Sequence, residues 1–204
     1  VADSGRPEHG SVRIRRLPAA EDDPLLGRLP VVFPAVEHHR DEVVALPPEL
    51  PRSSIEAIAT ALPDVTVEVW AFGRTPLAIS ARCYHARVHG HSKDSCQFVC
   101  DRDADGMTVE TLDHEPFLAV NGVQTLSYAF CNLLKEANDL VDTGVSSLRL
   151  SPHTCDMVAV AQLFRAVLDG RRDADEAFAL SHEACPSATF ANGFVHGAAG
   201  ALYV

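Results

Sequence analysis

The chain has 204 residues, 47% of them apolar, with a formal net charge of -11 and a mean hydropathy of +0.02. This length and composition suit one globular domain that buries most of its unfolded surface. The negative charge argues against nucleic acid as a partner, because phosphate binding requires a basic face.

The sequence shows neither a signal-peptide pattern nor an apolar run near the roughly 18 residues that span a bilayer. We therefore expect a cytoplasmic protein with no membrane span. In that reducing compartment, clustered cysteines bind metal or carry out redox chemistry more often than they form disulfides.

The first forty residues mix proline, glycine, paired acids and short apolar pieces, which predicts an irregular or partly disordered lead-in. A short buried strand is predicted at 43–47. A helix is predicted to follow, because Ser53 and Glu56 form a capping-box pattern at its start.

Alternating or continuous apolar residues predict four further strands, at 65–72, 77–80, 116–122 and 147–152. Apolar residues at helical spacing predict two further helices, one carrying Leu126, Phe130, Leu133, Leu134 and Ala137 and one running from Met157 to a stop at Gly170.

Short strands alternating with helices indicate βα units on a parallel sheet. A complete eight-stranded barrel typically takes about 250 residues, so the expected fold class is α/β, a partial (truncated) βα barrel of parallel strands with flanking helices. The predicted organisation is the lead-in at 1–40, a half-barrel domain at 41–172 that carries the cysteine cluster, and a Gly/Ala-rich tail at 173–204 that packs on that domain.

Three of the six cysteines lie within eighteen positions, in the order C-x12-C-x3-C at Cys83, Cys96 and Cys100. Thiolates hold iron–sulfur clusters, commonly four to a cluster, so this grouping favours a metal centre over three isolated core cysteines. Zinc stays open as an alternative, because His85, His89 and His91 lie between the cysteines.

A second set of candidates follows predicted strand ends, the positions at which βα barrels bind ligands. Asn121 and Gln124 come just after one strand, and Arg149 lies near the end of another. They are candidate substrate-binding residues, although an Asn-Gly turn and an ordinary ion pair explain the same residues equally well. The acidic segment "DRDADG" lacks the glutamate that completes a calcium loop, which favours a surface turn.

Several phrases in a fixed order resemble the collagenase-like peptidase-related family, in its UbiU/UbiV branch of oxygen-independent ubiquinone biosynthesis. They are "PLAISARCYHARVHGHSKDSCQFVC", "FLAVNGVQTLS", "LRLSP" and "ANGFVHGAAG", and the resemblance runs from about residue 43 to 198. It implies a βα-barrel protein with a 4Fe-4S cluster, in which Cys83, Cys96 and Cys100 match three ligands of the family.

The same resemblance implies a heterodimer with a UbiU-like protein, a lipid-carrier accessory protein as a further partner, and a role in ring hydroxylation. The family's fourth cysteine comes from an earlier segment, and this chain has no cysteine before Cys83. We expect the chain to lack the N-terminal half of that fold or to have diverged there, with Cys155 and Cys185 as weak substitutes. The alternative functions are a peptidase-like hydrolase and a zinc-stabilised binding module.

Overall fold

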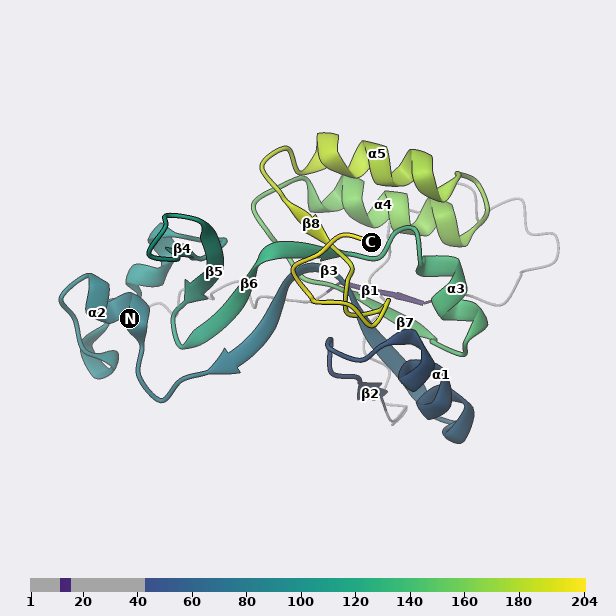
Figure 1. The fold of residues 1–204 in the computed structure, drawn as a ribbon, viewed down its shortest axis with the longest axis horizontal. Helices are drawn as coiled ribbons and strands as arrows, with labels where there is room; N and C mark the ends of the chain where they lie inside the picture. Colours follow the sequence, from purple (N-terminus) through teal and green to yellow (C-terminus); the bar gives the residue numbers. More distant parts are fainter. Residues whose placement is uncertain (1–11, 16–42) are drawn as a thin grey trace, which may run out of the picture.

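The structure, a computed structural model, describes residues 12–15 and 43–204. It consists of one mixed sheet with helices packed against it, and a small lobe at the end of a long strand pair (Figure 1). The strand order is β1-β7-β3-β6-β5-β4, with β2 beside β3 and β8 beside β6. The predicted lead-in lies outside the described residues, except that Val12–Arg15 forms β1.

The eight strands of the described residues are β1 (Val12–Arg15), β2 (Val43–Ala45), β3 (Thr66–Ile79), β4 (Met107–Glu110), β5 (Pro116–Asn121), β6 (Gln124–Asn132), β7 (Ser147–Leu150) and β8 (Phe190–Ala191). Three strand pairs are parallel: β2 with β3, β3 with β7 and β6 with β8. The remaining four pairs are antiparallel. The α/β class is therefore confirmed, whereas an all-parallel sheet is not what the chain forms, and no barrel is seen among the described residues.

The main departure lies at residues 126–132, which were predicted to be helical and instead belong to β6 (Gln124–Asn132). Asn121 and Gln124 face each other across a tight turn at Gly122, where φ is +61°. Such an Asn-Gly turn joins antiparallel strands, so β6 returns along β5 and then along β3. A helix, α3 (Ala137–Asp142), begins only at the last residue named for the predicted one.

The strand β3 runs through the position where two separate strands were predicted. Register shifts occur around Pro76, and Gly73 has a φ of +103°. Proline is tolerated in strands at such bulges. The result is one long strand whose first half lies in the body of the protein and whose second half carries the small lobe (Figure 1).

Helices α1 (Arg52–Ala61) and α4 (Met157–Leu168) match their predictions, and α5 (Ala174–Ala184) was not predicted. The capping-box prediction was wrong: Ser53 and Glu56 lie inside α1, whose N-cap is Pro51. In the C-terminal tail, Asp173 caps α5 by accepting hydrogen bonds from the backbone N–H groups of Asp175 and Glu176.

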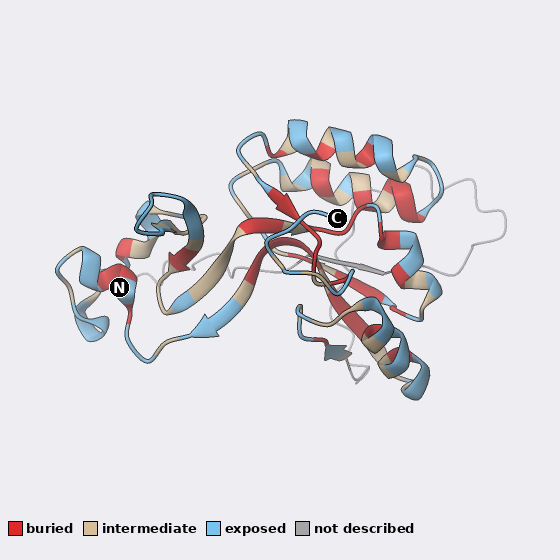
Figure 2. Ribbon diagram, viewed as in Figure 1, coloured by how far each residue is buried: buried red, intermediate tan, exposed pale blue. Residues whose placement is uncertain are grey.

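The apolar core belongs to the body. Phe72 is fully buried at its centre and contacts the rings of Phe130, Phe164 and Phe190 at centroid distances of 6.0–6.3 Å. Figure 2 shows buried residues running along the central strands and the inner faces of α4 and α5, and few in the small lobe. No helix in the described ranges is long and apolar enough to cross a membrane.

Candidate functional site

The small lobe, residues 80–123, is called the cysteine lobe below. It contains α2 (Tyr84–Val88), two short 3-10 helices, η2 (Lys93–Ser95) and η3 (Val99–Arg102), and the strands β4 and β5. Figure 1 shows it at the far end of the ribbon formed by β3 and β6, away from the helices of the body.

The first candidate ligand, Cys83, is the N-cap of α2. Its Sγ accepts a hydrogen bond from the backbone N–H of Ala86 at 3.3 Å, which satisfies one of the open donors of the helix. Cys83 is buried and forms the small core of the lobe with Ala86 and Val99. Cys96 packs against that same core. Two of the predicted thiols therefore belong to one contact cluster.

The third thiol, Cys100, lies on η3 directly after Val99. Burial raises the pKa of Cys100 above its ordinary value, Asp101 raises it further, and the neighbouring Cys83 and Cys96 add to the shift. Because Val99 belongs to the core of the lobe, the three sequence-predicted ligands lie on that core or directly beside it. Because a thiol must lose its proton to bind a metal, loading this site would release protons.

The turn between Cys96 and Cys100 is held in an unusual conformation. Gln97 and Phe98 have φ values of 51° and 53°, in the left-handed region that non-glycine residues rarely adopt. Backbone of this kind costs on the order of 1 kcal/mol per residue and is concentrated at ligand-binding sites. Here it redirects the chain so that η3 follows Cys96 after only two residues.

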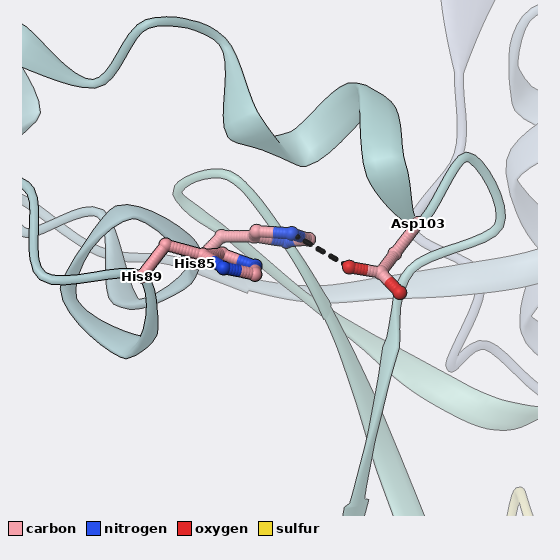
Figure 3. A group of neighbouring side chains, drawn as sticks. All are labelled: His85, His89 and Asp103. Carbon is pink, nitrogen blue, oxygen red and sulfur yellow. Dashed lines mark ion pairs between the residues drawn. The ribbon is translucent and has the colours of Figure 1, made fainter.

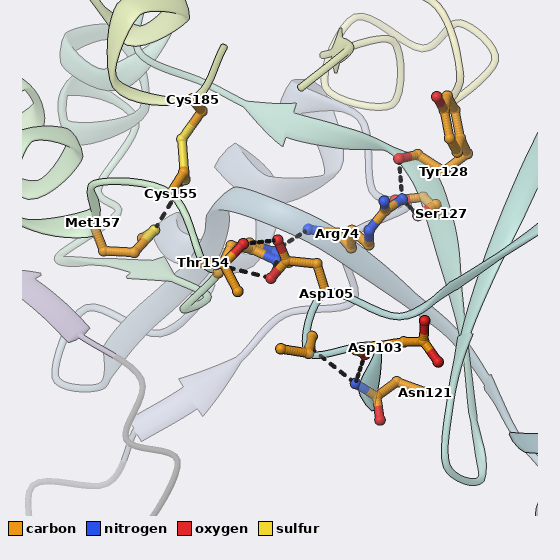
Figure 4. Close-up of polar contacts among 12 residues, drawn as sticks. Arg74, Asp103, Asp105, Asn121, Ser127, Tyr128, Thr154, Cys155, Met157 and Cys185 are labelled. Atoms are coloured by element: carbon orange, nitrogen blue, oxygen red, sulfur yellow. Dashed lines mark hydrogen bonds and ion pairs between the residues drawn. A yellow bond between two sulfur atoms is a disulfide. The ribbon is translucent and has the colours of Figure 1, made fainter. Parts of the chain in front are cut away.

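The other three cysteines are not available as a fourth ligand. Cys131 lies on β6, where burial raises the pKa of its thiol to about 12 and its Sγ contacts the carbonyl oxygen of Trp70. Cys155 and Cys185 form a disulfide, with a Cα–Cα distance of 5.0 Å (Figure 4). Their prediction as substitute ligands was wrong, because the packing of α4 against α5 brings the two thiols together instead.

Asn121 and Gln124 lie at the base of the cysteine lobe, on either side of the turn between β5 and β6. The side-chain amide of Asn121 donates to the carbonyl oxygen of Ala104 at 3.1 Å and so fixes the loop that follows η3 (Figure 4). Gln124 is exposed and pairs with Ile79 on β3. Both residues are close in space to the segment that carries the thiols.

Arg149 is not part of that neighbourhood. It lies on β7 beside Trp70, nine positions along β3 from Ile79. Its guanidinium pairs with the buried carboxylate of Glu68 at 2.6 Å. It also lines a pocket of about 180 Å³ with Trp70 and Pro76. The structure therefore separates Arg149 from Asn121 and Gln124.

A polar network ties the cysteine lobe to the body. Asp105 is the third residue after η3. Its carboxylate accepts hydrogen bonds from the backbone N–H and the hydroxyl of Thr154 (Figure 4). Its Oδ1 lies 3.3 Å from Nδ1 of His153, whose Nε2 accepts the backbone N–H of Arg74 at 3.0 Å. A backbone N–H can only donate, so the neutral imidazole of His153 carries its proton on Nδ1 and donates to Asp105.

The pKa values of this pair follow from the same contacts. Partial burial alone would raise the pKa of Asp105, but the hydrogen bonds from Thr154 and the interaction with His153 outweigh it, and the pKa lies below its ordinary value. Burial lowers the pKa of His153, against the opposing effect of Asp105. At neutral pH the link therefore joins a carboxylate to a neutral imidazole.

Together, the fold and the site define a mixed α/β protein that presents three reduced cysteines on a lobe of its own. The sequence model of Peptidase family U32 matches residues 35–203. The chain belongs to this family, the collagenase-like family to which its motifs point. No solved structure matches the chain.

Proposed function

We propose that the chain is an iron–sulfur protein whose cluster is held by Cys83, Cys96 and Cys100. The observation that carries the proposal is that Cys83 and Cys96 pack on one small core and that Cys100 directly follows Val99 of that core. Soft thiolates suit iron in such clusters, and the spacing keeps all three on a single lobe.

The residues present fit most of the ligand set that a 4Fe-4S cluster takes. Three thiols are available, and in the described part of the chain no fourth free cysteine lies with them, because Cys131 is in the body and the other two are joined in a disulfide. Among the described residues the fourth ligand is therefore not a cysteine, and a partner is one source for it. Such a cluster supplies one-electron redox chemistry when bound.

The surface of the cysteine lobe supports a protein partner. Of the twelve exposed large apolar residues in the described ranges, five lie on the cysteine lobe and two on the end of β3 that leads into it: Tyr84, Val88, Phe98, Leu112 and Phe117, with Leu77 and Ile79. Apolar surface gathered on one part of a protein marks an interaction site more often than scattered single residues do. We assign this surface to a heterodimer with a UbiU-like protein.

The biological role comes from the resemblance to the UbiU/UbiV branch, within a family membership that the match itself establishes. In this proposal the chain is the UbiV-like subunit, supports oxygen-independent ring hydroxylation in ubiquinone biosynthesis, and receives its apolar substrate from a lipid-carrier accessory protein. The candidate substrate contacts nearest the thiols are Asn121 and Gln124.

The site geometry does not favour a hydrolase. In the described ranges, no serine, threonine or cysteine side chain makes a hydrogen bond to an imidazole nitrogen. His153 has the carboxylate partner that a catalytic base has, but its Nε2 already accepts a backbone N–H. Since a nucleophile and its base must lie within hydrogen-bond reach, peptide cleavage is the less supported function.

The test is reconstitution of the full chain with iron and sulfide in the absence of oxygen, alone and together with a UbiU-like protein. The expected result is bound iron and sulfide with absorbance near roughly 400 nm, the region of iron–thiolate charge transfer. Replacing Cys96 or Cys100 with serine should abolish uptake, whereas Cys131→Ser is the matched control and should retain it.

Two results would count against the proposal. One is a parent chain that takes up neither iron nor sulfide in either setting. The other is uptake that survives loss of both Cys96 and Cys100, which would place the iron elsewhere.

A further inference from the structure

Three side chains of the cysteine lobe meet at one point that the thiols do not occupy. His85 on α2 and His89 at its C-cap are four residues apart, which puts both imidazoles on one side of the helix. Asp103, the C-cap of η3, approaches the same point from the other element (Figure 3). One ligand atom from each residue lies within 4.8 Å of the others.

The imidazole of His85 is completely buried, with 0% of its side chain exposed. Its Nε2 lies 2.9 Å from Oδ2 of Asp103, but neither ring nitrogen has a hydrogen bond of acceptable geometry to any described residue. The buried Nε2 of His89 also lacks a hydrogen-bond partner among the described residues. Buried polar atoms in native proteins are almost always satisfied, and an unsatisfied group often marks the site of an ion or water.

We infer that His85, His89 and Asp103 form a binding site for one divalent transition metal ion, with two imidazole nitrogens and one carboxylate oxygen as ligands. This donor set is that of zinc sites with an open fourth position and of two-histidine, one-carboxylate iron sites. Magnesium and calcium do not fit, because they take oxygen ligands almost exclusively. The site is distinct from the thiol set and goes beyond the proposed function.

The geometry needs little change to accept the ion. Ligand atoms bound at about 2.0–2.2 Å from one ion lie about 3–4 Å from each other. His85 and Asp103 are already at that separation, and the rings of His85 and His89 are stacked with their centroids 5.5 Å apart. The half-buried His89 supplies the third ligand, and one of its ring nitrogens already lies within 4.8 Å of the other two ligand atoms.

One contact bears on the tautomer of His89. The guanidinium of the exposed Arg102 lies 3.5 Å from Nδ1 of His89. Because a guanidinium only donates, this contact places the proton of a neutral His89 on Nε2. For Nε2 to hold a metal ion, the proton would have to be on Nδ1, and Arg102 would then have to give up this contact.

The experiment separates this site from the thiols. The full chain with Cys96→Ser and Cys100→Ser keeps Cys83 and its helix cap but cannot assemble a three-thiolate site. We expect this chain to bind one Zn²⁺ by isothermal titration calorimetry. With Co²⁺ as a spectroscopic probe, it should show the visible bands of nitrogen and oxygen ligation and no thiolate-to-cobalt charge-transfer band.

Asp103→Asn in the same background should weaken Zn²⁺ binding by at least about tenfold, since even supporting groups around a metal are worth tenfold or more. This change preserves side-chain shape, so it guards against the case in which loss of the buried His85 prevents folding. His114→Ala is the matched control, because His114 is 89% exposed and outside the group of three ligands. The Zn²⁺ affinity of this variant should equal that of the chain without it.

Three results would overturn the inference: no Zn²⁺ binding by the double cysteine variant, an unchanged affinity in Asp103→Asn, or a Co²⁺ spectrum with a thiolate band. Iron and sulfide uptake by the parent chain is a separate measurement. Failure of the proposed function therefore leaves this result intact, and the converse also holds.

Discussion

The body and the cysteine lobe are ordered by different kinds of interaction. The body has a contiguous core of twenty-three buried residues, which is centred on Phe72 and includes one half of a disulfide. The core of the lobe consists of three residues, Cys83, Ala86 and Val99, and one of them is a free thiol. Small units with so little apolar burial generally need a metal, a disulfide or a partner to be stable.

The difference suggests how structure and function are divided in this protein. The structure of the body is stabilised by the burial of apolar side chains in its core. In the lobe, the buried ring nitrogens of His85 and His89 lack hydrogen-bond partners, and they are ligands of the proposed metal ion site. The free thiols of the lobe are the ligands of the proposed cluster. The long ribbon of β3 and β6 connects the well-buried body to a lobe with few buried residues (Figure 2).

The largest expected effect concerns the body. Phe72→Ala removes a fully buried ring that contacts three other phenylalanines, so the free energy of unfolding should fall by about 3–5 kcal/mol. Urea unfolding followed by circular dichroism measures the change. Phe117→Ala is the control in the lobe, where the ring is 60% exposed, and it should cost less than about 0.5 kcal/mol. Equal losses in the two variants would show that the lobe shares the core of the body.

The second effect comes from the disulfide between Cys155 and Cys185, which closes a loop across a sequence separation of 30 residues. A loop of this length contributes about 3–4 kcal/mol in the chain-entropy account. Reduction with dithiothreitol should lower the stability of the body by that order, measured by thermal unfolding. The chain with Cys155→Ser and Cys185→Ser should show no further response to the reductant. A parent chain that is indifferent to the reductant would mean that this bond makes no contribution to stability.

The sequence was sufficient wherever local pattern decides the structure. Helical spacing predicted α1 and α4, and short apolar segments predicted β2, β5 and β7. It failed at β6, because Leu126, Phe130 and Leu133 are compatible with a helix and only pairing with β3 and β5 decides otherwise. The antiparallel half of the sheet follows from that one hairpin.

In the candidate site, too, the sequence predicted one part and tertiary packing decided the other. The spacing of Cys83, Cys96 and Cys100 predicted which thiols to group, and the structure places them on the core of the lobe or directly beside it. The approach of Asp103 to His85 was not predicted, because Asp103 was considered only as part of an incomplete calcium loop. Its signal was its position three residues after Cys100, on the element that also carries a thiol. Pairing of this kind depends on tertiary packing, which spacing along the chain does not reveal.

The third prediction tests the connection between the two regions. Asp105→Asn removes the charge that receives hydrogen bonds from Thr154 and His153, and should cost about 1–2 kcal/mol because the carboxylate is only partly buried. Hydrogen exchange should then increase in the lobe and in the loop around His153, with little change in α4 and α5. Asp101→Asn is the matched control, since Asp101 is an exposed acid of the same segment. Uniform loss of protection across the whole chain would indicate that the two regions unfold as one unit.

The smallest expected effect is the pH dependence of that connection. The folded protein holds the pKa of His153 below its ordinary value of about 6.5, because burial disfavours the charged ring, Arg74 adds to this, and Asp105 only partly opposes it. The unfolded chain therefore binds a proton at a higher pH than the folded chain does. Stability is fully present above about pH 6.5 and falls as the pH drops toward the folded pKa, with a slope of at most about 1.4 kcal/mol per pH unit.

Urea unfolding of the parent and of His153→Gln at a series of pH values between 8 and 5, each value set by buffer, isolates this contribution from that of the other histidines. The glutamine can accept the backbone N–H of Arg74 but does not titrate. The difference between the two stability curves should therefore narrow as the pH falls below about 6.5, because only the parent loses stability through this residue. A constant difference would mean that His153 keeps the same pKa in both states. In that case the link between lobe and body would depend on the Thr154 hydrogen bonds to Asp105 and not on a neutral imidazole.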